Sequence, residues 1–245
     1  MAEIVEGRHP VLEALKSGRP INKVLLAKGI GRHSAIGEIL QLAREQRVPV
    51  EYVPRPALDR AGSTLQHQGV IAYTAAHDYV SLDDLLAVSR DRNEPGLYCV
   101  LDGIEDPHNL GAILRCAETT GTHGVVVRSR RAVGLTAAVA RASAGAVEYV
   151  PVARVSNIAQ AIQQLQDQDV VVVGIDPEGD RVYTEVDFTT PTAFVIGAEG
   201  TGISHLVRKR CDALAAIPMR GRIGSLNASI AAALAMYEAL RQRGW

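Results

Sequence analysis

Hydrophobic and polar positions follow two different patterns along the chain, and the pattern changes near residue 96. Before that point, short amphipathic stretches predict a small mixed module, with helices at 7–18 and 37–47 and strands at 22–27, 49–53 and 69–74. From Leu97 onward, apolar runs predict buried strands, and the amphipathic segments between them predict helices. Apolar strands separated by helices indicate a parallel sheet that is covered on both faces. The whole chain is therefore predicted to be α/β.

The second part carries most of the predicted elements. Its strands are expected at 97–102, 124–127, 148–152, 170–176, 193–198 and 213–219, and its helices at 109–120, 136–144, 157–166, 204–209 and 227–241. The polar residues 77–95 predict a connector in which Ser81 caps a short helix through Leu86. This gives a small domain over 1–76, a linker over 77–95 and a larger domain over 96–245.

Composition is that of an ordinary folded protein. Apolar residues make up 47% of the chain and charged residues 22%, which argues against disorder. The formal net charge of -1 excludes a polybasic nucleic-acid binder, although a local cationic patch can still hold phosphates. Residues 1–78 contain ten Lys or Arg against eight Asp or Glu, an excess too small to predict an RNA-binding face by itself.

The cysteines and the N-terminus point to an intracellular setting. Cys99, Cys116 and Cys211 are scattered and odd in number, which argues against a disulfide framework and against a zinc site. The N-terminus has no apolar signal segment, and no apolar run approaches the roughly 18 residues of a membrane span. We therefore expect a cytoplasmic protein with no membrane segment and no metal.

Three loops that follow predicted strands carry the candidate chemistry. In the first, Asn109 is placed to cap the helix at 109–120, and Arg115 lies on an otherwise apolar face of that helix. An arginine there is either paired with a neighbouring carboxylate or directed into a site, and the residues alone leave both interpretations open.

The second loop, GAEGTGIS, contains Glu199 among three glycines. Its spacing matches neither the dinucleotide fingerprint nor the P-loop, and a lone glycine-rich loop is more often structural than functional. The third, at 217–229, combines cationic residues with a cluster of polar side chains, Ser225, Asn227 and Ser229, at the start of a long apolar helix. Loops between a strand's carboxyl end and a helix hold ligands in open α/β sheets.

The order NLGAILR, then GAEGTGIS, then IPMRGRIGSLNAS resembles the three motifs of the SpoU (TrmH) family of RNA ribose 2′-O-methyltransferases, which belongs to the SPOUT class. The motif match spans most of residues 97–245 and is highly specific. GRHPVLEAL and the module after it resemble, more loosely, the small ribosomal-protein-type RNA-binding domain of some members.

The resemblance implies a trefoil knot at the C-terminus, S-adenosylmethionine held within it, and a homodimer that shares residues across its interface. Matched by motif, the cofactor contacts would be Gly197, Gly200, Ile217, Met219, Ser225 and Leu226, and the catalytic polar residues would be Asn109, Arg115, Glu199, Asn227 and Ser229. Family members with this two-domain layout include one that methylates a guanosine in the peptidyl-transferase region of 23S ribosomal RNA, so the resemblance implies that target.

The chemistry of the motif residues can be checked against what methyl transfer requires. A ribose 2′-hydroxyl is a weak acid, so its proton must be removed or its developing charge stabilised. A guanidinium with a pKa above about 12 is a poor proton acceptor, so we expect Arg115 to hold an RNA phosphate and stabilise the alkoxide. Glu199 and Asn109 would then orient Arg115 or the ribose, and proton loss would be assisted by the phosphate or by water.

RNA contacts are expected from both domains. The candidates are Arg8, His9, Lys23, Lys28, Arg32 and His33 in the first and Arg128, Arg130 and Arg131 in the second, where a solvated loop is the alternative interpretation of the arginine run. Other functions stay open: a transfer-RNA guanosine 2′-O-methyltransferase, a ribosomal-RNA adenosine 2′-O-methyltransferase of the antibiotic-resistance type, or a non-catalytic RNA-binding assembly factor. The complete motif set argues against the last.

Overall fold

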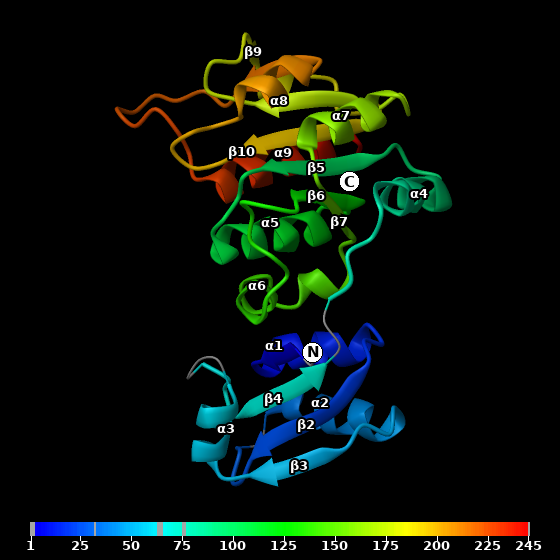
Figure 1. Ribbon diagram of the computed structural model, residues 1–245, viewed down its shortest axis with the longest axis vertical. Coiled ribbons are helices and arrows are strands. Elements are labelled where there is room, and N and C mark those ends of the chain that lie inside the picture. Colours follow the sequence, from blue (N-terminus) through cyan, green and yellow to red (C-terminus); the bar gives the residue numbers. More distant parts are fainter. Residues whose placement is uncertain (1–2, 32, 63–65, 75–76, 245) are drawn as a thin grey trace. The chain divides into compact units, whose positions relative to one another are not determined.

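The computed structural model describes residues 3–31, 33–62, 66–74 and 77–244. Contacts within the chain divide it into two compact units: unit 1 comprises Met1–Asp78 with Gly134–Tyr149, and unit 2 comprises Tyr79–Val133 with Val150–Trp245. Each unit has its own sheet and helices, so the predicted α/β class is confirmed (Figure 1). The predicted limits of the two domains and the linker stay a prediction.

Unit 1 is built on a sheet of four strands among its described residues, in the order β1-β4-β2-β3. Its elements are β1 (Glu3–Glu6), α1 (Arg8–Lys16), β2 (Ile21–Ala27), α2 (Ser34–Glu45), β3 (Val50–Val53), α3 (Arg55–Ala61), β4 (Val70–Thr74), α6 (Ala137–Ala142) and the 3-10 turn η1 (Ala146–Glu148). β2 and β3 are parallel, whereas β4 is antiparallel to both β1 and β2. Helices α1 and α2 cover one face of this sheet and α3 covers the other.

The segment Gly134–Tyr149 is fastened to the rest of unit 1 by buried ion pairs. Arg141 Nη1 lies 3.1 Å from Oε2 of Glu6, and Arg19 Nη1 lies 3.0 Å from Oε1 of Glu148. Both carboxylates are almost fully buried, where an unpaired charge would be costly. Although this segment lies between two strands of unit 2 in the sequence, its contacts group it with the N-terminal residues.

The described residues of unit 2 form a seven-stranded sheet in which every pairing is parallel, in the order β7-β6-β5-β10-β8-β11-β9. The strands are β5 (Leu97–Asp102), β6 (Gly124–Arg128), β7 (Val152–Val155), β8 (Val171–Ile175), β9 (Arg181–Val182), β10 (Thr192–Gly197) and β11 (Ala213–Ala216). Because the strands are parallel, all their carboxyl ends meet at one edge. This is the edge where open α/β sheets bind ligands.

Helices cover both faces of this sheet, as predicted (Figure 1). They are α4 (Leu82–Arg92), α5 (Pro107–Thr119), α7 (Ile158–Gln166), α8 (His205–Arg210) and α9 (Ala228–Gln242), with a 3-10 turn η2 (Tyr183–Glu185). Helices α4, α7 and α8 pack in one apolar cluster with side chains such as Val100 and Val195. Helices α5 and α9 pack against each other on the remaining side.

Several predicted details are wrong. Asn109 does not cap α5: Asp106 does, accepting a hydrogen bond from His108 N at 2.9 Å, because Pro107 starts the helix two residues earlier. Ser81 caps α4 with a capping box, but the helix runs to Arg92 rather than Leu86.

The strand expected at 148–152 is also wrong. The 3-10 turn η1 ends at Glu148, and β7 begins only at Val152. Three short elements, β1, α3 and β9, were not predicted, since four- and two-residue strands and a seven-residue helix with prolines at its start leave little periodicity to detect.

Candidate active site

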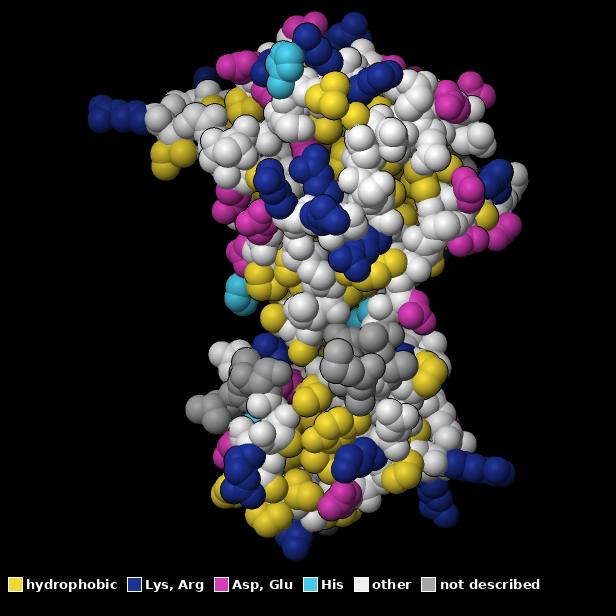
Figure 2. All heavy atoms as spheres, in the orientation of Figure 1, with side chains coloured by type: hydrophobic (Ala, Val, Ile, Leu, Met, Phe, Trp, Pro, Cys, Tyr) yellow, Lys and Arg dark blue, Asp and Glu magenta, His cyan; other side chains and the backbone are white. Residues whose placement is uncertain are grey.

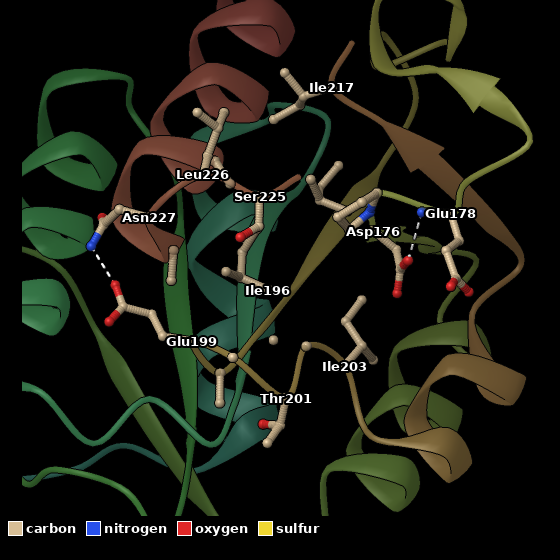
Figure 3. Close-up of a pocket in the computed structure, with 18 of the residues that line it drawn as sticks. Asp176, Glu178, Ile196, Glu199, Thr201, Ile203, Ile217, Ser225, Leu226 and Asn227 are labelled. Carbon is tan, nitrogen blue, oxygen red and sulfur yellow. Dashed lines mark hydrogen bonds between the residues drawn. The ribbon is translucent and has the colours of Figure 1, made fainter. Parts of the chain in front are cut away.

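A pocket of about 580 Å³ opens at the carboxyl edge of the unit 2 sheet. It is lined by residues that follow β8, β10 and β11 and by the start of α9: Ile175–Glu178, Ile196–Ile203, Arg208, Ile217, Met219, Ser225–Ala228 and Ala231. All six residues that the family resemblance assigns to the cofactor lie in this lining. The second and third motif loops therefore form opposite parts of one cavity (Figure 3).

Glu199 connects the three motif loops at one end of this pocket. Its Oε1 accepts a hydrogen bond from Asn109 Nδ2 at 3.0 Å and another from Asn227 Nδ2. Asn227 Nδ2 also donates to Asn109 Oδ1 at 2.9 Å. Residues 90 and 118 positions apart along the sequence are thus joined into one carboxylate–amide network. Figure 3 shows its hydrogen bond between Asn227 and Glu199.

Asn227 has a second, structural role as the N-cap of α9. Its Oδ1 accepts from Ser229 N at 2.9 Å, from Ile230 N at 3.3 Å and from Ser229 Oγ at 2.6 Å. The oxygen of the amide fixes the helix start, while the nitrogen is free to bind Glu199. The same side chain therefore sets both the position of α9 and the geometry of the network.

Gly197 is required by the shape of the loop that follows β10. Ala198 and Gly202 exchange two backbone hydrogen bonds, of 3.2 and 2.8 Å, so the chain folds back on itself. A Cβ on Gly197 would lie 2.1 Å from the carbonyl carbon of Gly202, which no rearrangement of a side chain could relieve. The glycine is thus explained by the loop's own backbone.

Asp102 ties this loop to the end of β5. Its Oδ2 accepts a hydrogen bond from Ser204 N at 2.9 Å, and its Oδ1 lies 3.3 Å from Arg128 Nη2. Asp102 is buried, so both partners contribute to the balance of its charge. Arg128, which was expected to bind RNA, is therefore partly engaged inside the protein.

Sequence reasoning missed the opposite end of the pocket, formed by Asp176, Glu178 and Arg208. Arg208 Nη1 lies 2.8 Å from Glu178 Oε2 and 3.8 Å from Asp176 Oδ2, and these contacts raise the pKa of the guanidinium. The signal was available: the apolar strand β8 ends directly in Asp-Pro-Glu-Gly, at the sheet edge where ligands bind. The lining then holds three carboxylates against one guanidinium.

Three predicted catalytic residues lie outside the pocket lining: Asn109, which joins it through its hydrogen bonds to Glu199 and Asn227, and also Arg115 and Ser229. Arg115 is exposed on α5 and forms no ion pair with the described residues of its own chain, so the intramolecular ion-pair interpretation is wrong. Ser229 is half-buried and, among the described residues, its side chain donates only to Asn227. Beside α5, α9 exposes an apolar stripe of Ile230, Leu234 and Tyr237.

The predicted RNA-binding residues fall in different environments. Arg8, His9 and His33 line a common hollow on unit 1, Lys23 approaches Glu51 at 3.9 Å, and Lys28 is exposed. Arg32 lies outside the described residues. In unit 2, Arg130 and Arg131 are exposed on the loop after β6, and one face of this unit carries a group of Lys and Arg side chains (Figure 2).

Among the described residues, no group of three or more His, Cys, Asp or Glu side chains is arranged to hold a metal ion. Within the same residues, no helix is both long and apolar enough to cross a membrane.

Comparison with known proteins identifies the family. The sequence model of the SpoU rRNA Methylase family matches residues 96–237, and that for RNA 2′-O ribose methyltransferase substrate binding matches residues 4–80. This chain therefore belongs to the SpoU (TrmH) family of RNA methyltransferases, and the predicted family is confirmed. Among its relatives, a protein named as TrmH family tRNA/rRNA methyltransferase YacO, from Bacillus subtilis (strain 168), is 44% identical over 98% of this chain and 96% of that protein.

Solved structures agree with this assignment. The SpoU methyltransferase AviRb from Streptomyces viridochromogenes, in complex with AdoMet, has a TM-score of 0.82 and 29% identity over 98% of this chain and 90% of that one. The AdoMet-bound rRNA methyltransferase from Sinorhizobium meliloti has a TM-score of 0.79 and 25% identity over 98% and 87%. The TrmH/SpoU tRNA modifying enzyme of A. aeolicus covers only 66% of this chain and 84% of its own, with a TM-score of 0.55 and 28% identity.

Proposed function

We propose that this chain methylates a ribose 2′-hydroxyl of ribosomal RNA with S-adenosylmethionine, at a guanosine in the peptidyl-transferase region of 23S RNA. The observation that carries the proposal is the network of Glu199, Asn109 and Asn227 at the end of the pocket. Three motif loops supply one polar residue each, and the network they form borders a cavity of cofactor size.

The pocket suits this cofactor in charge as well as in size. S-adenosylmethionine carries a sulfonium, an ammonium and a carboxylate, and so has one net positive charge. Three carboxylates against one guanidinium in the lining favour such a cation. Gly197, Gly200, Ile217, Met219, Ser225 and Leu226 would hold it, supplying backbone groups and apolar walls, and when bound it supplies an electrophilic methyl group.

The protein's own part in the reaction is to position the ribose and to stabilise charge. Glu199 uses Oε1 for both amides, and its Oε2 has no hydrogen bond to the described residues, so that oxygen can accept one from the ribose hydroxyl. The pair of amide donors fixes the carboxylate in place before the substrate arrives. Arg115 would hold the neighbouring phosphate and stabilise the developing alkoxide.

Arg115 reaches this position through a homodimer. The exposed stripe on α9 has the four- and three-residue spacing of one helix face, and Tyr237 Oη donates to Thr119 Oγ1 of α5 at 3.3 Å. A second copy that covers this apolar stripe would also cover the helix that carries Arg115. Arg115 of the partner subunit would then serve the pocket, and the knot predicted for the C-terminal region would lie at this interface.

Ribosomal RNA is favoured over transfer RNA because of unit 1. The ribosomal-RNA methyltransferase from S. meliloti matches 98% of this chain, whereas the tRNA modifying enzyme of A. aeolicus matches 66%. Residues 4–80 match a substrate-binding domain, and such a domain is expected in an enzyme that recognises RNA beyond its catalytic pocket.

The decisive experiment measures methyl transfer directly. Purified protein, tritiated S-adenosylmethionine and RNA from a strain that lacks the gene should give label in 23S RNA, and mass spectrometry should locate it in one 2′-O-methylguanosine. Label confined to transfer RNA, or to an adenosine, would replace the proposed substrate. No transfer to any RNA would contradict catalysis and favour the assembly-factor alternative.

A further inference from the structure

Two hollows on the surface of unit 1 meet at His33. The first, of about 380 Å³, is polar and is lined by Arg8, His9, His33, Arg55 and Gln68. The second, of about 540 Å³, is largely apolar and is lined by Gly29, Ile30, Gly31, His33, Ser34, Ile36, Gly37, Leu40 and Tyr52. Both sizes fall within the range of about 300–1,000 Å³ that is usual for small-molecule sites.

The polar hollow is built for an anion. Its lining contains two arginines and two histidines and no carboxylate. Arg55 is exposed and forms no ion pair with the described residues of the chain. His33 accepts a hydrogen bond from Ala35 N at Nδ1, so a neutral ring carries its proton on Nε2 as a further donor. The first turn of α2, which begins at Ser34, adds the positive end of a helix dipole.

One side of the polar hollow is a strained turn held by buried groups. His67, fully buried, accepts from Gly69 N at 3.0 Å and contacts Asp59 Oδ1 at 2.8 Å through Nε2. Gln68, which lies between His67 and Gly69 in the sequence, has a φ of 53°. This conformation costs free energy in a residue with a side chain. Such strain persists only where the surroundings impose it, and here it fixes the direction of Gln68.

Gln68 in turn joins the turn to Arg8. Its Oε1 accepts from Arg8 N and its carbonyl oxygen accepts from Arg8 Nε, each at 3.3 Å. The amide nitrogen of Gln68 has no hydrogen bond to the described residues, so it remains a donor at the polar hollow. These two hydrogen bonds hold the guanidinium of Arg8 in a fixed orientation at the polar hollow.

The adjoining apolar hollow offers a surface for a flat ring. Tyr52 is 49% exposed, although an aromatic side chain of this size is normally largely buried. Ile30, Ile36 and Leu40 complete the apolar lining. Exposed aromatic rings beside cationic groups are how proteins hold the bases of single-stranded RNA.

We propose that the two hollows together bind one unpaired RNA nucleotide. Its phosphate lies in the polar hollow against Arg8, Arg55 and the donors of His33 and Gln68, and its base lies in the apolar hollow against Tyr52. A paired nucleotide is excluded, because both faces of its base are covered by the helical stack. This inference rests on the proposed function in that RNA is the substrate, and it adds Arg55, Gln68 and Tyr52 to the residues expected from the sequence.

The test compares three variants of the full chain that each lower its charge by one. Arg55→Gln removes a cation from the polar hollow, Gln68→Glu places an isosteric anion there, and Arg44→Gln removes an exposed cation near the other end of α2. Tyr52→Ala removes the stacking ring without changing charge. Fluorescence anisotropy would measure their affinity for a short single-stranded RNA and for the same strand paired with its complement, over a series of salt concentrations.

The two hollows have distinct signatures in this experiment. Arg55→Gln and Gln68→Glu should weaken single-strand binding about 5- to 10-fold, and Arg55→Gln should reduce the slope of log affinity against log salt by about 0.7, the contribution of one phosphate contact. Tyr52→Ala should weaken binding at least about fivefold and leave that slope unchanged. Arg44→Gln should change neither the single-strand affinity nor its salt slope. All variants should bind the duplex with the same affinity as the wild type.

The proposal is overturned if Arg55→Gln and Gln68→Glu behave like Arg44→Gln, or if Tyr52→Ala leaves single-strand affinity unchanged. It is also overturned if the variants lose duplex binding equally. Methyl transfer to RNA by wild-type protein together with such a result would reject the nucleotide site and keep the proposed function. Site-dependent RNA binding by a wild-type protein that transfers no methyl group would keep the site and reject the function.

Discussion

The two candidate binding sites of this chain have opposite charge. The pocket of unit 2 is lined by three carboxylates and one guanidinium, whereas the polar hollow of unit 1 is lined by two arginines, two histidines and no carboxylate. The first suits a small cation and the second suits the phosphate of RNA. The comparison also exposes a difficulty: an anionic RNA must bring its ribose to the edge of an acidic pocket.

Arg115 is the cation that would resolve this difficulty, and its removal should have the largest effect. Arg115→Ala should lower the rate of methyl transfer by at least about 100-fold, because the developing alkoxide and the adjacent phosphate would face Glu199 without a counter-charge. The cofactor's dissociation constant, measured by calorimetry, should stay unchanged, since the proposed partner of Arg115 is the RNA phosphate and Arg115 does not line the pocket of its own subunit. Loss of cofactor binding as well would show that Arg115 is structural.

If the proposed homodimer forms, mixed dimers can show which subunit supplies Arg115. If it acts across the interface, a dimer of one Arg115→Ala chain and one Glu199→Ala chain contains one site with both residues intact. Such mixtures should regain methyl transfer that neither variant shows alone. Absence of any recovery in a confirmed heterodimer would place both residues in the same subunit.

The sequence was informative about the pocket where a motif and a strand end coincide. Asn109, Glu199 and Asn227 were expected at one site, and the structure brings them within hydrogen-bonding distance because β5 and β10 are parallel neighbours. Asp176 was missed because its loop belongs to none of the three motifs, although it follows an apolar strand as they do.

Other features could not be derived from local pattern. Gly134–Tyr149 lies between β6 and β7 of unit 2 in the sequence, but buried pairs such as Arg19 with Glu148 group it with unit 1. Contacts between residues 129 positions apart leave no periodicity in the sequence. The exposure of Tyr52 could not be predicted either, because an aromatic residue in a short strand is normally expected in a core.

The acidic character of the pocket should show as discrimination between cofactor and product. The product S-adenosylhomocysteine lacks the sulfonium charge, so Asp176→Asn should weaken binding of S-adenosylmethionine about tenfold and that of the product much less. Arg208→Gln should shift the same ratio in the opposite direction. Calorimetry with both ligands measures it, and an equal loss for both would mean that Asp176 acts through shape or hydrogen bonding.

The two sites should differ in how strongly their ligand affinities depend on salt concentration. Affinity for RNA should fall steeply as salt rises, by a log–log slope of about −0.7 for each single-strand phosphate contact, while cofactor affinity changes little. Arg130→Gln should reduce the RNA slope by about one such step. Arg128→Gln should reduce it less, because its guanidinium already lies 3.3 Å from Asp102. An RNA affinity that does not respond to salt would contradict the electrostatic model.

The smallest effect is expected at Glu148, a carboxylate that unit 1 holds away from its polar hollow. Burial alone would raise the pKa of Glu148, but His77 and Arg19 outweigh it and hold that pKa below its usual range. A lowered carboxyl pKa stabilises the fold above the unfolded value, and the contribution is lost as pH falls through the folded value. Glu148→Gln should therefore cost about 1–3 kcal/mol at pH 7.

The corresponding measurement is the thermal midpoint of wild type and variant across pH. The difference should be about 2–4 °C for each kcal/mol at neutral pH, and it should close as the pH falls below the ordinary carboxyl value of about 4.3. RNA affinity should stay at the wild-type level, because Glu148 pairs with Arg19 and not with the arginines of the polar hollow. If Glu148→Gln strengthened RNA binding, this carboxylate would be acting on the hollow's field, and the contrast between an acidic and a basic site would be weaker than the lining residues indicate.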